Sequence, residues 1–264
     1  MSQLQRLVIA PAQFQQQQIA LTLQQQHYLT RVLRMRQGDR FIAMDGHGTW
    51  WMAALEETTA QILESITVQT ELPVAVTLMV ALPKGNGFDE VVRACTELGV
   101  NCFAPIESDR TLLHPSPQKL ERWRRIAAEA AEQSERQIVP TILDPVSLST
   151  GLSSVTGDRK YICVARGDLP HLLNCLSDHF ASPHWEGGLG GSYCPSQEGL
   201  GESIVIATGT EGGWTTNEVE NAIAAGFQPV SLGKPILRAV TAPIVAMSQI
   251  SAIVEISSNS GNSE

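Results

Sequence analysis

Apolar runs that alternate with amphipathic helix patterns dominate the sequence after Leu72-Pro73. The run VAVTLMVALP (74–83) is continuous and rich in β-branched residues, which is typical of a strand buried on both faces of a sheet. A short strand is expected over 102–108, and three more apolar strands are expected over 160–166, 203–209 and 227–233. Helix patterns lie over 88–100, 117–136, 215–225 and 241–252. Strands alternating with helices predict a parallel α/β sheet.

Residues 1–72 follow a different pattern. A strand is expected over 6–10, and two apolar runs around Asp45-Gly46-His47-Gly48 predict a hairpin over 39–57. We therefore expect a small, mostly β domain over 1–72 and an α/β domain over 73–264. Within the second domain, the Gly-, Ser- and Pro-rich segment 182–202 predicts a mobile surface loop.

The composition is that of a globular protein, with 43% hydrophobic and 17% charged residues in a chain of 264. A net charge of −9 argues against a surface that is basic throughout, although a local basic face remains possible. The five cysteines form no C-x-x-C pair, so we expect no zinc or disulfide framework. No apolar run approaches the ~18 residues of a membrane span, and no signal-peptide core is evident, so a cytoplasmic location is expected.

Three of the predicted strands end in turns that contain glycine: 164–167, 208–213 and 231–235. Ligands of open α/β sheets bind beyond the carboxyl ends of strands, and glycines let a ligand approach the backbone. Any one of these turns alone would be an ordinary connection, but three together predict a shared pocket. Neither G-x-G-x-x-G nor a P-loop is present. Glu211 either begins a helix as a favourable acid or orients a ligand or the glycine turn.

The segment TGTEGGWTTNEVE (208–220) is similar to the IGPEGGWT…E signature of the bacterial 16S ribosomal RNA uracil-N3 methyltransferases. These enzymes belong to the SPOUT superfamily, which uses S-adenosylmethionine. Further segments resemble that family in the same order along nearly the whole chain: 27–41, 82–100, 108–136 and 231–242. The sequence departs from the family pattern at Thr210, where proline is usual, at Asn86-Gly87 and at Ala239-Val240.

The resemblance implies an α/β protein with an N-terminal PUA-like β-barrel and a C-terminal SPOUT-type knotted α/β methyltransferase domain. It implies a homodimer and S-adenosyl-L-methionine as cofactor, held mainly by backbone groups of the three turns. The residues it assigns to cofactor binding are Ala165, Thr208, Gly209, Gly212, Gly213, Ser231, Leu232, Gly233, Ile236 and Leu237.

The implied activity is methylation of N3 of a uridine in 16S rRNA of the small ribosomal subunit. This reaction needs a proton acceptor and a cation or donor beside the developing uracil anion. The candidate catalytic residues are Arg238, Glu211, Arg93 and Arg110. The candidate RNA-binding residues are Arg31, Arg34, Arg36 and Arg136. A second basic cluster either contacts RNA or is simply a solvated helix face; it consists of Lys119, Arg122, Arg124 and Arg125. Arg93 and Arg136 have the same alternative interpretation as ordinary surface residues.

Two other classes of function stay open. One is a non-catalytic RNA-binding or ribosome-assembly protein that retains the fold. The other is a nucleotide-dependent metabolic enzyme, which the lack of a glycine-rich fingerprint after 74–83 disfavours. Binding of S-adenosylmethionine separates the first of these from a methyltransferase.

Overall fold

The structure is a computed structural model that describes residues 4–180 and 202–260. The loop predicted over 182–202 lies, except for Glu202, outside these residues. The chain divides into two compact units. The first comprises residues 1–71 and 131–139, and the second comprises residues 72–130 and 140–264.

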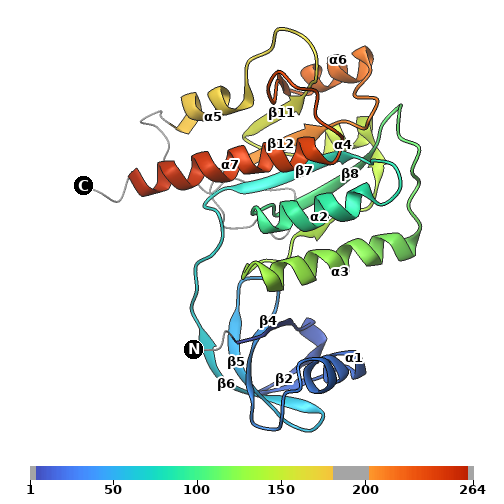
Figure 1. Cartoon of the computed structure of the whole chain (residues 1–264). Coiled ribbons are helices and arrows are strands. Elements are labelled where there is room, and N and C mark those ends of the chain that lie inside the picture. The colour runs from blue at the N-terminus through green and yellow to red at the C-terminus, as the bar shows by residue number, and fades with distance from the viewer. Residues whose placement is uncertain (1–3, 181–201, 261–264) are drawn as a thin grey trace. The chain divides into compact units, whose positions relative to one another are not determined.

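The first unit is built on a six-stranded sheet in the order β1-β4-β5-β6-β3-β2 (Figure 1). Its strands are β1 (Arg6–Val8), β2 (Phe14–Gln15), β3 (Gln18–Ala20), β4 (Arg40–Met44), β5 (Trp50–Leu55) and β6 (Thr59–Ile66). Only β1 and β4 pair in parallel among the described strands of this sheet. The remaining elements are η1 (Pro11–Gln13), α1 (Leu23–His27) and η2 (Tyr28–Val32), and Leu29 of η2 is fully buried in the core.

The predicted hairpin is confirmed by the antiparallel pairing of β4 with β5. Its turn is stabilised by Asp45, whose Oδ1 accepts hydrogen bonds from the backbone N–H groups of His47 at 2.8 Å and Thr49 at 3.0 Å. Gly46 and Gly48 adopt φ of +74° and +113°, a region that favours glycine. Asx-type bonding together with glycine explains why this stretch of sequence turns back on itself.

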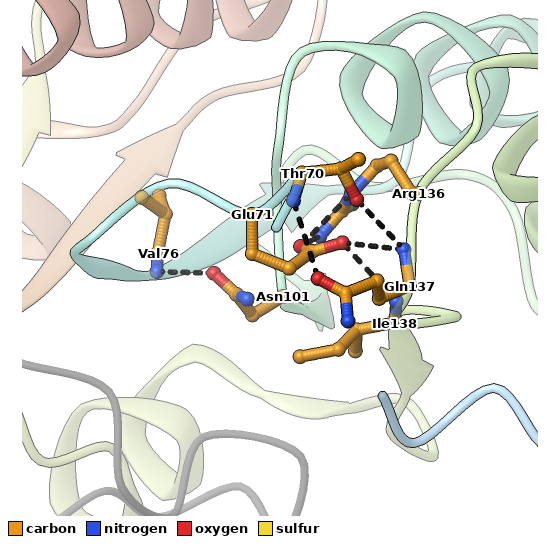
Figure 2. A network of polar contacts seen from close by, with 7 residues as sticks. All are labelled: Thr70, Glu71, Val76, Asn101, Arg136, Gln137 and Ile138. Carbon is orange, nitrogen blue, oxygen red and sulfur yellow. Dashed lines mark hydrogen bonds and ion pairs between the residues drawn. The ribbon is translucent and has the colours of Figure 1, made fainter. Parts of the chain in front are cut away.

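Residues 131–139, which we call the return segment, complete the first unit although they come 60 residues after its main part. Figure 2 shows Glu71 at the centre of the contacts that hold this segment. One carboxylate oxygen accepts from the guanidinium of Arg136, and the other accepts from the backbone N–H groups of Gln137 at 2.9 Å and Ile138 at 3.1 Å. Thr70 and Gln137 exchange two further hydrogen bonds of 3.2 Å.

This network corrects the prediction that Arg136 binds RNA. Its side chain is only 4% exposed and forms an ion pair with Glu71. A phosphate contact needs an accessible cation, and this guanidinium is buried against its own carboxylate. The predicted helix also ends earlier, at Gln133, and Glu135 just beyond it adopts a φ of +61°.

The second unit contains a parallel sheet in the order β10-β8-β7-β12-β11-β13, with β9 added beside β8. Its strands are β7 (Ala75–Ala81), β8 (Cys102–Glu107), β9 (Thr141–Ile142), β10 (Val146–Ser147), β11 (Arg159–Cys163), β12 (Ser203–Thr208) and β13 (Gln228–Val230). Every pairing between the described strands of this sheet is parallel, which confirms the prediction. Every residue of β7 and β12 is buried, as expected for central strands covered on both faces.

Helices flank this sheet (Figure 1). They are α2 (Gly87–Glu97), α3 (Pro117–Gln133), α4 (Leu148–Ser154), α5 (Leu172–Phe180), α6 (Thr216–Ala224) and α7 (Thr241–Ser260). Leu152 of α4 and Ala222 of α6 share one core cluster with Met79 and Val205 of the sheet. Helix α7 packs against α2 and α5. None of the described helices has the length and apolar character needed to cross a membrane.

We predict that Arg136→Met destabilises the return segment by about 3–5 kcal/mol, because it leaves the Glu71 carboxylate buried without its cation. Native-state hydrogen exchange at the amides of Gln137 and Ile138 measures this effect. The matched control is Arg125→Met, which removes an exposed ion pair with Glu129 and should change stability by no more than about 0.5 kcal/mol. Equal protection in the two variants would contradict a stabilising role for the buried pair.

Candidate active site

The turn that follows β12 is set by the start of α6. Thr215 caps this helix: its Oγ1 accepts from the backbone N–H of Glu218 at 3.2 Å, and the Glu218 carboxylate accepts from the N–H of Thr215 at 2.7 Å. The other oxygen of Glu218 accepts from the N–H of Asp109 at 2.9 Å. This reciprocal capping box therefore fixes the end of the turn and ties it to the loop after β8.

The glycines of this turn, residues 208–214, are required by close packing and by backbone conformation. A Cβ on Gly209 would lie 3.3 Å from Gly213 and from the Trp214 ring. A Cβ on Gly212 would lie 2.9 Å from Cδ of Arg110. Gly213 adopts a φ of +67°, which L side chains rarely tolerate. The glycines thus serve the folding of the turn itself, in addition to any ligand.

Arg110 and Glu211, both predicted as catalytic, hold this turn in place. The Arg110 guanidinium donates to the carbonyl of Gly212 and, at 3.3 Å, to that of Trp214. Glu211 accepts a hydrogen bond of 3.0 Å from the backbone N–H of Lys84, in the loop between β7 and α2. Each side chain therefore has a partner in the protein, and of the two interpretations of Glu211 these contacts favour the one that holds the glycine turn.

The third turn, after β13, is closed by Ser231. Its Oγ accepts from the N–H of Gly233 at 3.1 Å, and Gly233 adopts a φ of +120°. The backbone N–H of Ser231 also donates to the carbonyl of Pro170, and the carbonyl of Ser231 accepts from the N–H of Leu172, each at 2.9 Å. These bonds join the loop after β11 to the loop after β13, so the two turns form one wall.

All three turns line a single cavity of about 320 Å³, as the sequence predicts. This volume is at the lower end of the range for small-molecule sites. The predicted cofactor-binding residues in the lining are Ala165, Gly209, Gly212, Gly213, Leu232, Gly233, Ile236 and Leu237. Of the predicted catalytic residues, Arg110 and Glu211 line the cavity.

Four of the residues predicted for cofactor binding or catalysis are not part of the lining. Thr208 is fully buried at the end of β12, and Ser231 is half-buried beside the cavity wall. Arg93 is exposed on α2, and the structure does not bring it to the cavity. Arg238 is exposed between Leu237 and Ala239, which both line the cavity. Its carbonyl accepts from the N–H groups at the start of α7.

The lining also contains residues that the sequence analysis did not assign: Cys163, Val164, Arg166, Thr210, Trp214, Pro235, Ala239 and Ala242. Most of them are next to an assigned residue in the chain, so their position at the predicted strand ends was the sequence signal that could have identified them. Thr210 Oγ1 and Trp214 Nε1 are buried and have no hydrogen-bond partner in the described part of the chain. A buried polar atom without a partner costs about 1–3 kcal/mol, so these two atoms retain unused capacity for a ligand.

Cys163 contributes a neutral thiol to the cavity. Burial raises the pKa of this thiol to about 12, so at neutral pH the fraction of reactive thiolate is negligible. Among the described residues, no group of His, Cys, Asp and Glu side chains is arranged to hold a metal ion. The cavity therefore offers backbone groups, hydroxyl and indole donors and guanidinium cations.

We predict that iodoacetamide leaves Cys163 unmodified in the folded protein at pH 8, because the raised pKa keeps the thiol protonated well above that pH. Peptide mass spectrometry after a timed reaction measures the extent of modification, and the guanidinium-unfolded chain is the control in which Cys163 reacts. Rapid modification of native Cys163 at pH 8 would show that the thiol is neither buried nor raised in pKa.

The chain thus combines a mostly antiparallel β unit with a parallel α/β unit that carries a cavity at the carboxyl ends of its strands. A protein-family model described as "RNA methyltransferase domain" matches residues 70–251. A second family model, described as "RNA methyltransferase PUA domain", matches residues 21–66. The ribosomal RNA small subunit methyltransferase E of Synechocystis is 49% identical over 95% of this chain and 78% of its own length. That of Bacillus subtilis is 30% identical over 90% of this chain and 91% of its own length.

Among solved structures, the ribosomal RNA small subunit methyltransferase E of Neisseria gonorrhoeae, bound to S-adenosyl methionine, superimposes with a TM-score of 0.77. It is 28% identical, and the match covers 95% of this chain and 98% of that one. The chain belongs to the ribosomal RNA small subunit methyltransferase E family. The resemblance and the two-part fold are thereby confirmed, while the knot stays a prediction.

Proposed function

We propose that this protein transfers a methyl group from S-adenosyl-L-methionine to N3 of a uridine in 16S rRNA. The observation that carries the proposal is the convergence of three strand-end turns on one cavity. Family membership supports the reaction class, since its relatives are named as methyltransferases of small-subunit ribosomal RNA. The choice of uracil N3 rests on the resemblance of the glycine turn and its neighbouring motifs.

The cavity fits S-adenosyl-L-methionine, to which the Neisseria relative is bound. Backbone groups at Ala165, Gly209 and Leu232 would hold it, and Thr210 Oγ1 and Trp214 Nε1 supply unused hydrogen-bonding atoms. The cofactor contains no phosphate, which agrees with the absence of a phosphate-binding motif. When bound, it supplies the methyl group as the electrophilic carbon of a sulfonium.

Arg238 is the residue to which we assign stabilisation of the uracil anion. Removal of the N3 proton spreads negative charge onto the two carbonyl oxygens, where a preorganised cation lowers the energy of the transition state. Arg110 is already bonded to the glycine turn, and Arg93 lies away from the cavity. The side chain of Arg238 makes no hydrogen bond or ion pair with the described residues, and its chain neighbours line the cavity.

The basic residues of the first unit are assigned to RNA binding. Arg31, Arg34 and Arg36 are exposed, and none forms an ion pair within residues 4–180 and 202–260. In contrast, the exposed arginines of α3 are paired with acids: Arg122 with Asp89, Arg124 with Glu121 and Asp144, and Arg125 with Glu129. A cation that has no protein partner is the one available to a phosphate.

Three further expectations belong to this proposal. The protein acts as a homodimer, as the family resemblance implies. It works in the cytoplasm, where small ribosomal subunits assemble. Residues 1–72 form the RNA-binding domain, to which the return segment 131–139 also belongs, and the rest of 73–264 forms the methyltransferase domain. The competing function, RNA binding without catalysis, is distinguished by the experiment that follows.

We predict that the purified protein forms 3-methyluridine in small subunits isolated from a strain that lacks the corresponding gene. Mass spectrometry of the 16S rRNA nucleosides measures the product.

At saturating RNA, Arg238→Ala should lower the single-turnover rate by on the order of 10²-fold, because it removes a cation aimed at developing charge. Arg93→Ala removes an equal charge from α2 and should keep the wild-type rate.

The outcomes of this experiment separate the alternatives. RNA binding without any 3-methyluridine would favour the non-catalytic protein, and a methylated base other than 3-methyluridine would correct the target atom. If Arg238→Ala methylates at the wild-type rate, Arg238 has no catalytic role.

We predict that the double variant Arg31→Gln/Arg36→Gln has a shallower salt dependence of RNA binding. The slope of log K against log salt concentration should fall by up to about 0.9 for each lost phosphate contact, since each contact releases condensed counterions. The affinity for S-adenosylmethionine should not change. Arg34 is left in place because its φ of +56° would add a backbone effect to the loss of charge. The charge-matched control is Arg124→Gln/Arg125→Gln on α3, and an equal slope in both double variants would refute the assignment.

A further inference from the structure

We propose that a second phosphate-binding surface surrounds the opening of the cavity in the methyltransferase unit. It consists of Lys84, Arg166, Lys234 and Arg238, which we call the rim cations. Lys84, Arg166 and Lys234 bind the RNA backbone on either side of the uridine that enters the cavity, while Arg238 keeps its assigned role at the uracil anion. The inference rests on the proposed function and adds to it the contacts that deliver the substrate to the site.

Each rim cation is tied by the chain to the wall of the cavity. Arg166 itself lines the cavity. Lys234 lies between Gly233 and Pro235, and Arg238 lies between Leu237 and Ala239, and all four of these neighbours are lining residues. The backbone N–H of Lys84 bonds to Glu211, which also lines the cavity. Three different loops, one of which carries both Lys234 and Arg238, thus bring the four cations to, or directly beside, the same opening.

The pattern of pairing separates the rim cations from most others in the chain. All 18 Lys and Arg residues lie within the described residues, and half of them are held by a carboxylate, a carbonyl or an aromatic ring. Those whose side chains have no such contact in residues 4–180 and 202–260 are Arg31, Arg34, Arg36 and Arg40, the rim cations Lys84, Arg166, Lys234 and Arg238, and Arg93. Apart from Arg93 on α2, unpaired positive charge is therefore concentrated at two places, of which only one was recognisable as a cluster in the sequence.

The remaining charges near the opening leave it positive. The lining contains two guanidinium groups, Arg110 and Arg166, and one carboxylate, Glu211, which accepts from the N–H of Lys84. Asp168 is exposed in the loop that carries Arg166, but no ion pair joins the two. Helix α7 begins at Thr241 without an acidic residue in its first turn, so its N-terminal end adds positive potential beside the lining residue Ala242.

The chemistry of the rim cations fits RNA phosphate better than the cofactor carboxylate. All four are exposed, and an exposed ion pair with a single carboxylate contributes little to binding. The cofactor carries one carboxylate, whereas a polynucleotide brings a row of phosphates and gains from the counterions released at each contact. An enzyme that modifies a base must also take that base into its pocket, which leaves the flanking phosphates at the opening.

The test uses Lys84→Gln/Lys234→Gln, because neither residue lines the cavity, and compares RNA binding by the full chain across salt concentrations. With two contacts to single-stranded RNA lost, the slope should fall by about 1.4. A fourfold increase in salt should then weaken the variant about sevenfold less than it weakens the wild type. Affinity for S-adenosylmethionine should stay at the wild-type value, which also shows that the methyltransferase unit is folded. Adding Arg166→Gln should lower the slope further.

The control Arg124→Gln/Arg125→Gln removes the same charge from paired positions and should keep the wild-type slope. If the triple variant also keeps that slope while the wild type methylates 16S rRNA, the rim cations do not bind RNA and the proposed function stands without them. If Arg166→Gln weakens S-adenosylmethionine binding and leaves the RNA slope unchanged, the guanidinium serves the cofactor and the inference is wrong. If the wild type neither binds nor methylates 16S rRNA, the proposed function fails, and this inference fails with it.

Discussion

The cavity depends on the hydrogen bonds that fix the glycine turn between β12 and α6. Thr215 and Glu218 cap α6, and the second oxygen of Glu218 holds the loop after β8. From that loop Arg110 reaches back to the carbonyls of the turn, while Glu211 binds the loop after β7. Because these contacts converge on a segment with little side-chain bulk, the turn is rigid without filling the space beside it. Rigid, preformed sites bind ligands at a lower entropic cost than flexible ones.

Local patterns account for the parts of the fold that were predictable. The continuous apolar run of β7, the Asp45 turn and the capping signal at Thr215 each act within a few residues, and each predicted element is present. The return segment was not predictable in this way. Its position depends on the pairing of Arg136 with Glu71, 65 residues away, and Arg136 resembles a surface residue when only its helix pattern is considered. Long-range ion pairs leave no periodicity in a sequence.

The candidate site shows the same limit at the level of single residues. The sequence analysis assigns Arg110 and Glu211 to catalysis but cannot indicate whether they face a ligand or the backbone, and in the structure both bond to backbone groups. Conversely, Arg166 received no assignment, although it follows Ala165 at the end of a predicted strand. The distinguishing property is whether a charged side chain already has a partner in the protein, and this emerges only when distant loops are brought together.

A net charge of −9 is compatible with an RNA substrate because charge acts locally. At physiological ionic strength the Debye length is about 8 Å, so acids elsewhere on the surface are largely screened from a phosphate at the contact. The acids of α3 and its neighbours neutralise the arginines of that helix. Such pairing reduces the number of places where an RNA backbone finds free cations, and it thereby disfavours non-specific binding. An acidic chain with two groups of unpaired cations can consequently discriminate between correct and incorrect modes of docking better than a uniformly basic one.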